Sequence, residues 1–217
     1  MVASDYKFEE LTSCSHPDFE EFYRIYANSI AARERKSRTW ICEMVGRSDY
    51  KVLLLKHSNQ VTGFSVLFLP QTENFGVLEY MAIADAYRNQ GLGAELFRRA
   101  MQATRPAQRG QPGPILLEVD SDREKSPDQG LRTRRQQFYR RLGCAMISGL
   151  HYIMPLPGVG PPPEMDLFIY GEDRRQISKA ELEKRLKIIY QGIYNCPPED
   201  PRIGQMLAGV SDPILLT

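Results

Sequence analysis

Apolar residues recur along the chain with two different spacings, and these spacings predict strands and helices. Short apolar or alternating runs are typical of strands. They occupy residues 6–11, 50–57, 61–69, 77–83, 115–119, 145–155 and 166–170. Apolar residues three and four positions apart predict helices with one buried face. This spacing covers residues 19–30, 40–45, 92–100, 131–142 and 182–193.

Local signals predict where several of these elements begin and end. Ser58-Asn59-Gln60 separates two strands and predicts a hairpin. Gly46 and Gly143 are placed to terminate helices. Ser178 and Glu181 form a capping box at a helix start. The stretch 196–217 is dotted with prolines and is predicted to wrap over the surface.

The stretch 76–101 combines a buried strand, a turn with two glycines and the start of a helix. The apolar run 77–83 precedes the turn, and helical spacing begins at Leu92, between Gly91 and Gly93. A helix N-terminus presents unpaired N–H groups with a partial positive charge, and glycines let an anion approach them closely. The stretch is therefore predicted to bind an anionic group, for which a pyrophosphate is the best candidate.

Two other phosphate-binding patterns fit this turn less well. A nucleotide P-loop needs Lys-Ser or Lys-Thr after the second glycine, where this chain has Ala94-Glu95. A dinucleotide-binding turn needs a third Gly or Ala where Leu96 stands. The acid that such a fold also needs at the end of the next strand has candidates in Glu118 and Asp120.

The spacing R-x-x-G-x-G from Arg88 resembles the signature of the GNAT superfamily of N-acetyltransferases. The strand 78–83 before it and the segment 138–144 after it, FYRRLGC, resemble further parts of that family in the same order. The resemblance covers roughly residues 6–170. It implies an α/β (α+β) fold with a mixed, mostly antiparallel central sheet flanked by helices. The expected domains are a GNAT acyltransferase domain over 1–171 and an extra C-terminal helix and tail over 172–217, packed on the same domain.

The resemblance also implies that acetyl-coenzyme A, or another acyl-coenzyme A, is the co-substrate and that no metal is needed. In the family, the pantetheine arm bonds to the backbone of the central strand, and the turn wraps the pyrophosphate. The strand residues are Met81, Ala82 and Ile83. The turn residues are Arg88, Asn89, Gln90, Gly91, Leu92, Gly93 and Ala94.

Glu79 is the first candidate for the base that an acceptor amine requires. Strand alternation would place its side chain on one face with Val77 and Met81. A glutamate within an apolar strand needs a partner or a function. The other interpretation is a structural ion pair with an arginine, and some family members carry their base two residues earlier, at the position of Val77.

Other candidate residues lie further along the chain. Glu118 and Asp120 are the next candidates for the base, or for orienting the amine, although a solvated strand end is the alternative. Tyr139 matches the family's tyrosine that protonates the departing thiolate; the alternative is a core aromatic beside Phe138. Of three histidines, only His151, with its neighbour Tyr152, is a candidate for lining an acceptor pocket.

Composition limits the other function classes. A formal net charge of +1 argues against binding to nucleic acid or to an anionic membrane. The four cysteines are scattered and form no metal-ligand cluster with the three histidines, so free thiols in a reducing cytoplasm are expected. The N-terminus lacks a signal-peptide pattern, and no apolar run is long enough to span a bilayer.

The sequence therefore predicts a cytoplasmic N-acyltransferase that transfers an acyl group directly in a ternary complex. The acceptor is a small-molecule or peptide amine, and the chain is a monomer or homodimer. Residues 23–40 and 155–165 are expected to border the acceptor. One alternative is a long-chain acyltransferase using a carrier-protein thioester, and another is a non-catalytic acyl-coenzyme A-binding module.

Overall fold

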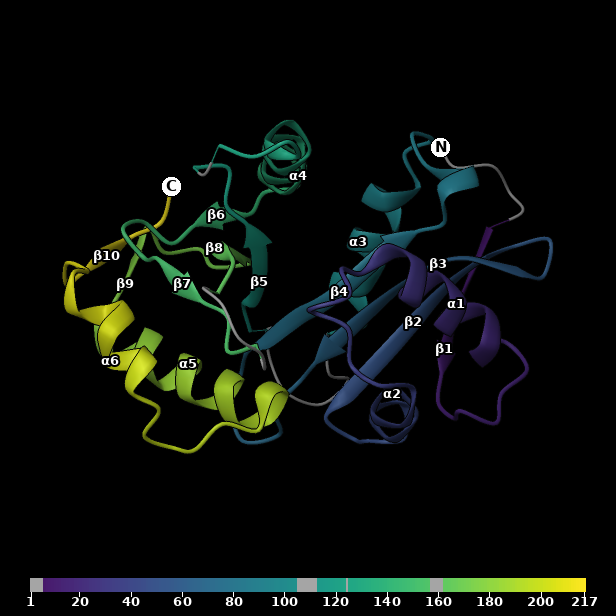
Figure 1. Cartoon of the computed structure of the whole chain (residues 1–217), viewed down its shortest axis with the longest axis horizontal. Coiled ribbons are helices and arrows are strands. Elements are labelled where there is room, and N and C mark those ends of the chain that lie inside the picture. The colour runs from purple at the N-terminus through teal and green to yellow at the C-terminus, as the bar shows by residue number, and fades with distance from the viewer. Residues whose placement is uncertain (1–5, 105–112, 124, 157–161) are drawn as a thin grey trace. The chain divides into compact units, whose positions relative to one another are not determined.

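A computed structural model describes residues 6–104, 113–123, 125–156 and 162–217 (Figure 1). The chain forms two compact units, residues 1–112 and 113–217. The fold is mixed α/β with a mostly antiparallel sheet, as the family resemblance implied, and the strand pairings described within each unit are antiparallel. No helix among the described residues is long and apolar enough to cross a bilayer. The division expected at 171/172 stays a prediction.

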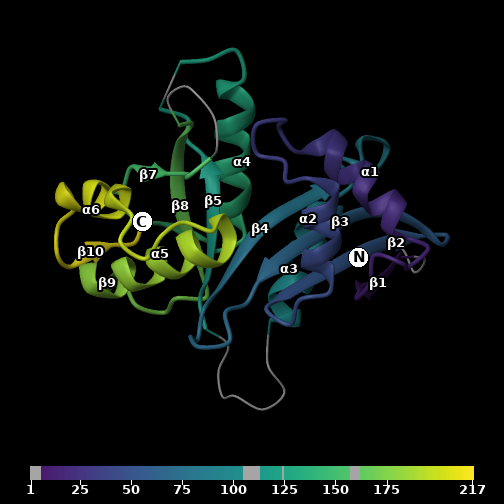
Figure 2. The same cartoon turned by 60° about the horizontal axis from the view of Figure 1, so that its bottom comes forward.

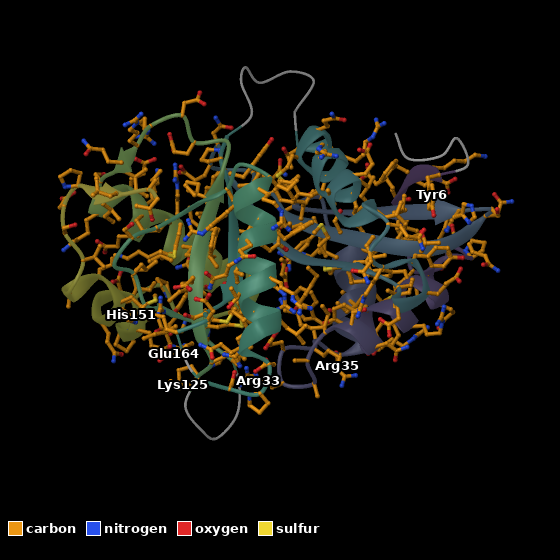
Figure 3. The ribbon with its side chains drawn as sticks, turned by 90° about the horizontal axis from the view of Figure 1, so that it is seen from above. Tyr6, Arg33, Arg35, Lys125, His151 and Glu164 are labelled. Carbon is orange, nitrogen blue, oxygen red and sulfur yellow. A yellow bond between two sulfur atoms is a disulfide. The ribbon has the colours of Figure 1, made fainter. Side chains whose placement is uncertain are left out.

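The described part of the first unit contains four strands in sequential order: β1 (Tyr6–Leu11), β2 (Tyr50–His57), β3 (Gln60–Phe68) and β4 (Gly76–Ile83). The predicted hairpin between β2 and β3 is confirmed, with Ser58 and Asn59 both at positive φ. This geometry matches the right-handed twist of the paired strands. At the start of β1, Tyr6 stacks on His57 with ring centroids 4.7 Å apart (Figure 3).

A β-bulge interrupts the pairing of β3 with β4. Val66 pairs with Tyr80 and Leu67 pairs with Leu78, so Glu79 is the extra residue on β4. A bulge bends its strand and redirects side chains. The predicted alternation that would put Glu79 on one face with Met81 does not hold across this position.

Within residues 6–104, three α-helices belong to the first unit: α1 (Phe19–Ser29), α2 (Arg38–Val45) and α3 (Leu92–Ala103). α1 packs Phe22 edge-on against Phe64, at 5.0 Å between centroids. Its buried face also includes Ile25 and Tyr26, whereas Tyr23 is half-buried. On α3, Leu92 and Leu96 cluster with β2 residues. Helices therefore cover both faces of these strands (Figures 1 and 2).

The expectation that all four cysteines are free is wrong for two of them. Cys14, before α1, forms a disulfide with Cys42 of α2. The two residues are 28 positions apart, so sequence spacing did not indicate that folding brings their Cα atoms to 5.1 Å. Cys144 and Cys196 are free thiols.

In the second unit, β5 (Ile115–Asp120) pairs with β8 (Glu164–Tyr170), which also pairs with β6 (Ala145–Met146) and β7 (Tyr152–Ile153). The single strand predicted over 145–155 is therefore two short strands. Gly149, at φ 75°, lies in the turn between them. α4 (Gln129–Arg141) buries Gln136, whereas Leu131, expected on its buried face, is 61% exposed.

The chain then forms β9 (Gln176–Ile177), α5 (Lys179–Tyr194), α6 (Pro201–Ala208) and β10 (Ile214–Leu215). The predicted cap of α5 is confirmed, because Ser178 Oγ accepts a hydrogen bond from the Glu181 amide at 3.1 Å. The tail is more regular than predicted. Asp200 caps α6, which has proline at its first position, and β10 pairs with β9.

Candidate active site

The turn after β4 has the conformation that its glycine and asparagine residues predict. Asn89 and Gly91 both adopt positive φ, at 62° and 79°. Gly91 is the N-cap of α3, and its carbonyl accepts from the amides of Ala94 and Glu95 at 3.1 and 3.3 Å. Among the described residues, no atom lies within 4 Å of where a Gly91 Cβ would be. The helix N-terminus that was predicted to bind an anion is therefore present and uncrowded at Gly91.

Arg88 connects this turn to the end of β4 through a hydrogen bond and an ion pair. Its Nε donates to the Ile83 carbonyl at 3.0 Å, and its guanidinium pairs with Asp85 at 2.8 Å. Asp85 lies in the short 3-10 helix η1 (Asp85–Tyr87) between strand and turn. The Arg88 side chain is half exposed, so it both orders the turn and stays accessible to an anion.

The three strand residues predicted to bind pantetheine pair with β3 through one edge of β4. Met81, Ala82 and Ile83 lie opposite Ser65, Phe64 and Gly63. All three are half-buried, whereas Val77 and Leu78 earlier in the strand are buried. At Gly63 a Cβ would come within 2.6 Å of the Ile83 side chain, so glycine permits this close pairing.

Glu79 faces the connection between α1 and α2, where it meets a lysine. Its side chain is 2% exposed, and Lys36 Nζ lies 2.8 Å from its Oε1. Lys36 Nζ also lies 3.6 Å from the centroid of the Trp40 ring. Burial, and then the nearby Glu79 charge, raise the pKa of Tyr50 well above its usual range. A structural ion pair was one interpretation of Glu79, but the expected partner was an arginine.

Two tyrosine hydroxyls hold the segment that carries Lys36. Tyr26 of α1 accepts a hydrogen bond from the Lys36 amide at 2.7 Å, and Tyr80 of β4 donates to the Glu34 carbonyl at 3.1 Å. The rings of Tyr26 and Tyr80 contact edge-on, with centroids 5.1 Å apart. The lysine that pairs with Glu79 is therefore fixed by its backbone as well as by its ammonium group.

Glu118 lies in the second unit, where two tyrosines bind its carboxylate. Tyr152 of β7 donates to Oε1, and Tyr194 of α5 donates to Oε2 at 2.5 Å. Burial and the Glu118 charge raise the pKa of Tyr152, which keeps its hydroxyl protonated. The interpretation as a solvated strand end does not fit these contacts. Of the pair His151 and Tyr152, only Tyr152 is buried.

Tyr194 is the residue that sequence reasoning missed. It ends α5, outside the part of the chain that resembles the GNAT family. Its only sequence signal was its place one turn after Tyr190 on a predicted helix. The contact joins residues 76 positions apart and could not be read from local spacing.

Tyr139 and Asp120 both belong to the second unit. Burial raises the pKa of Tyr139 to about 12, so its hydroxyl is protonated at neutral pH. Its ring contacts Phe138 edge-on at 5.2 Å. Asp120 forms an ion pair with Arg135 of α4, and its carbonyl accepts from Gln136 at 3.1 Å. Asp120 therefore links β5 to α4.

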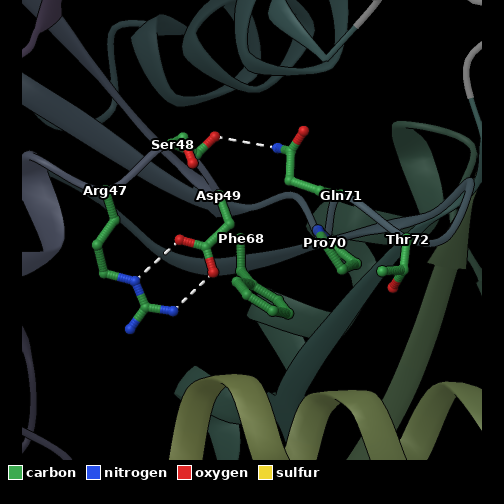
Figure 4. Close-up of a pocket in the computed structure, with 7 residues that line it drawn as sticks. All are labelled: Arg47, Ser48, Asp49, Phe68, Pro70, Gln71 and Thr72. Atoms are coloured by element: carbon green, nitrogen blue, oxygen red, sulfur yellow. Dashed lines mark hydrogen bonds and ion pairs between the residues drawn. The ribbon is translucent and has the colours of Figure 1, made fainter.

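A cavity of about 550 Å³ lies at the junction of α2, β2 and β3 in the first unit (Figure 4). Seven residues line it: Arg47, Ser48, Asp49, Phe68, Pro70, Gln71 and Thr72. Arg47 donates twice to Asp49, at 2.9 and 2.6 Å, and Gln71 donates to the Ser48 carbonyl. None of the predicted site residues lines this cavity. Part of the expected acceptor border, residues 157–161, lies outside the described residues.

Comparison with known proteins confirms the resemblance inferred from the sequence. Residues 48–143 match the family model of the acetyltransferase (GNAT) domain, which includes the β4 turn, α3 and Tyr139. A putative GNAT-family acetyltransferase from Bacteroides thetaiotaomicron is 18% identical with a TM-score of 0.71. The match covers 88% of this chain and 99% of that one. The fold is therefore a GNAT fold, and it extends beyond the segment that the family model matches. No curated protein sequence matches the chain.

Two further solved structures with the same fold contain acetyl-coenzyme A. A GNAT-family acetyltransferase from Elizabethkingia anophelis is 15% identical, with a TM-score of 0.52, over 77% of this chain and 98% of that one. Arabidopsis thaliana NAA60 is 14% identical, with a TM-score of 0.56, over 76% and 97% of the two chains. At these identities the likeness concerns the fold.

Proposed function

We propose that the protein is an N-acyltransferase that moves an acetyl or other acyl group from acyl-coenzyme A to an amine. The observation that carries the proposal is the left-handed Gly91 at the N-terminus of α3, within a segment that matches the GNAT domain. Acetyl-coenzyme A in two structures of the same fold supports this choice of co-substrate. Direct transfer in a ternary complex is the simplest mechanism, because no covalent intermediate on the protein is required.

The backbone supplies most of the proposed co-substrate binding. Residues 88–94 would surround the pyrophosphate with the amides at the start of α3. Residues 81–83 would bond to the pantetheine arm through their main chain. Arg88 has a second role in this proposal. Its hydrogen bond to the Ile83 carbonyl holds the turn against the end of the strand.

The acceptor amine must lose a proton before its lone pair can attack the thioester carbonyl. Glu79 and Glu118 remain the candidates to receive it, and their surroundings differ. Glu79 already neutralises Lys36, so an amine could bind there only after displacing that lysine. Glu118 accepts hydrogen bonds from two tyrosine hydroxyls, which hold its carboxylate in one orientation. We therefore propose Glu118 as the residue that receives the acceptor amine and its proton, and Glu79 as the alternative base.

Tyr139 is proposed to assist the departure of coenzyme A. Its pKa of about 12 lies above that of a thiol, at about 8.5 for a free cysteine, so complete proton transfer to the thiolate is uphill. A hydrogen bond to the sulfur while negative charge develops is still favourable. Tyr139 would therefore stabilise the leaving thiolate, and water would supply the final proton.

The phosphate-binding assignment is tested by two substitutions at Gly91. Gly91→Val places a β-branched residue at φ 79°, and we expect acetyl-coenzyme A binding, measured by calorimetry, to be lost because the turn is strained. Gly91→Asn tolerates positive φ and should keep the turn while adding a side chain. If the phosphate approaches the backbone at this position, Gly91→Asn will also weaken binding. Undiminished affinity in both folded variants would refute the assignment.

The reaction itself is tested by coenzyme A release from acetyl-coenzyme A. The assay uses phenethylamine, spermidine and peptides with a free N-terminal alanine or a lysine. We expect release that depends on the amine and yields the N-acetyl product by mass spectrometry. Tight binding of acetyl-coenzyme A without transfer to any acceptor would favour a non-catalytic binding module.

A further inference from the structure

We infer that Tyr194, on the C-terminal helix α5, is a positioning residue that holds the Glu118 carboxylate for the acceptor amine. The inference rests on the proposed function and assigns a role to a segment beyond residues 48–143, which match the GNAT domain. On this interpretation α5 completes the acceptor site.

Both carboxylate oxygens of Glu118 accept a hydrogen bond from a tyrosine. Tyr152 reaches Oε1 from β7 and Tyr194 reaches Oε2 from α5, so two separate elements each bind one oxygen. A phenol that donates to a carboxylate forms a charge-assisted hydrogen bond, which is stronger than one between neutral groups. With both oxygens bound, the carboxylate cannot rotate freely about its terminal torsion.

A stack of tyrosines fixes the two donors. Tyr152 contacts Tyr190 edge-on at 6.4 Å, and Tyr190 contacts Tyr194 edge-on at 6.3 Å. The hydroxyl of Tyr190 donates to the Ile153 carbonyl, which ties α5 to β7. Tyr152 and Tyr190 are both buried. The rings of both donors therefore pack against Tyr190, which supports them in addition to their bonds to Glu118.

This arrangement suits a ligand that carries a positive charge and hydrogen-bond donors. A carboxylate offers about four acceptor directions, so two phenol donors orient it and leave it able to accept from an ammonium group. A primary amine that arrives as its ammonium form matches both features, and its proton can pass to the carboxylate it binds.

The test is steady-state kinetics of Tyr194→Phe with the best amine acceptor from the panel. We expect KM for the amine to rise about tenfold or more, because one charge-assisted hydrogen bond is lost, while KM for acetyl-coenzyme A is unchanged. The matched control is Tyr6→Phe. That variant also loses one phenol hydroxyl, but from β1, where the Tyr6 ring stacks on His57, and we expect its KM values to match those of the parent.

A double-mutant cycle separates positioning from a structural role. In a Glu118→Gln background, Tyr194→Phe should raise KM for the amine little further, because the group it positions is already altered. Tyr152→Phe removes the other donor and serves as the second variant if Tyr194→Phe does not fold; the same rise is expected.

The outcomes distinguish this inference from the proposed function. An active parent enzyme whose Tyr194→Phe and Tyr152→Phe variants keep the parent KM for the amine would overturn the inference alone. Equal increases for both substrates, or an increase for Tyr6→Phe as well, would also overturn it, because such changes are not specific to the amine site. A parent that transfers acetyl to no amine would overturn the proposed function and, with it, this role for Tyr194.

Discussion

The contact between Lys36 and Glu79 is a nearly buried ion pair, with side chains 15% and 2% exposed. Such a pair costs desolvation energy that its mutual attraction has to offset. Removing one partner leaves the other charge buried and uncompensated. The Trp40 ring over Lys36 and the Tyr26 hydroxyl on its amide show how much of the α1–α2 connection is arranged around this single charge.

Lys36→Met and Glu79→Gln are each expected to lower the free energy of unfolding by about 3–5 kcal/mol, the range for breaking a buried pair. The double variant should recover much of that loss, because neither charge is then left alone. Urea denaturation of all four proteins measures the coupling. Lys187→Met is the control, since Lys187 and Glu183 form an exposed pair of little expected value. If the double variant lost as much unfolding free energy as the two single variants combined, the pairing would be contradicted.

Tyr139→Phe tests the proposed role of the hydroxyl on α4. The ring should still pack, so the thermal stability is expected to stay close to that of the parent. Turnover should fall on the order of a hundredfold, the low end for removing one hydrogen-bond donor that stabilises developing negative charge. Because the pKa of Tyr139 is raised to about 12, the ratio of the variant's turnover to that of the parent should be the same from pH 6 to 9. A turnover equal to that of the parent across this range would exclude the role.

At the scale of elements, the sequence predicted most of what has a local cause. Ser178 marks the start of α5 and Gly46 marks the end of α2, and both helices were predicted. Helix α6 was missed because the prolines around it suggested an irregular tail, whereas Pro201 occupies the first turn, where proline is tolerated. The strand predicted over 145–155 failed because Gly149 allows a turn inside an apolar run.

In the candidate site, too, the features with a local cause were predicted and those that depend on distant residues were not. The phosphate turn could be predicted because its glycines, its strand and its helix are contiguous. The partners of Glu79 and Glu118 could not be predicted. Lys36 lies 43 residues before Glu79, and Tyr194 lies 76 residues after Glu118. Such contacts depend on the packing of distant elements, which hydrophobic spacing does not specify.

For the whole molecule, the buried tyrosines predict sensitivity to alkali. Burial raises the pKa of tyrosines in both units, and Tyr139 reaches about 12. A phenol in the unfolded chain ionises near pH 10. The pKa of each of these tyrosines is higher in the folded protein than in the unfolded chain. Their contribution to the free energy of unfolding is therefore complete below about pH 10 and is lost as the pH rises through the folded pKa.

We therefore expect the free energy of unfolding to be steady from pH 7 to 9 and to fall steeply above pH 10. Urea denaturation at half-unit pH steps measures the slope. Tyr152→Phe should make the decline shallower, because one group that must ionise on unfolding has been removed. An identical slope in that variant would contradict a large contribution from Tyr152.

The bulge at Glu79 has a consequence for comparing this strand with those of related proteins. Residues before and after the bulge follow separate alternations, since Leu78 and Tyr80 pair with adjacent residues of β3. An alignment that runs through position 79 without a gap can therefore match a side chain on one face with a side chain on the other. The two-residue offset between Glu79 and the base position of some family members, that of Val77, ends at this irregularity. A role cannot be carried from one position to the other by counting, and the inserted residue has to be located in each relative first.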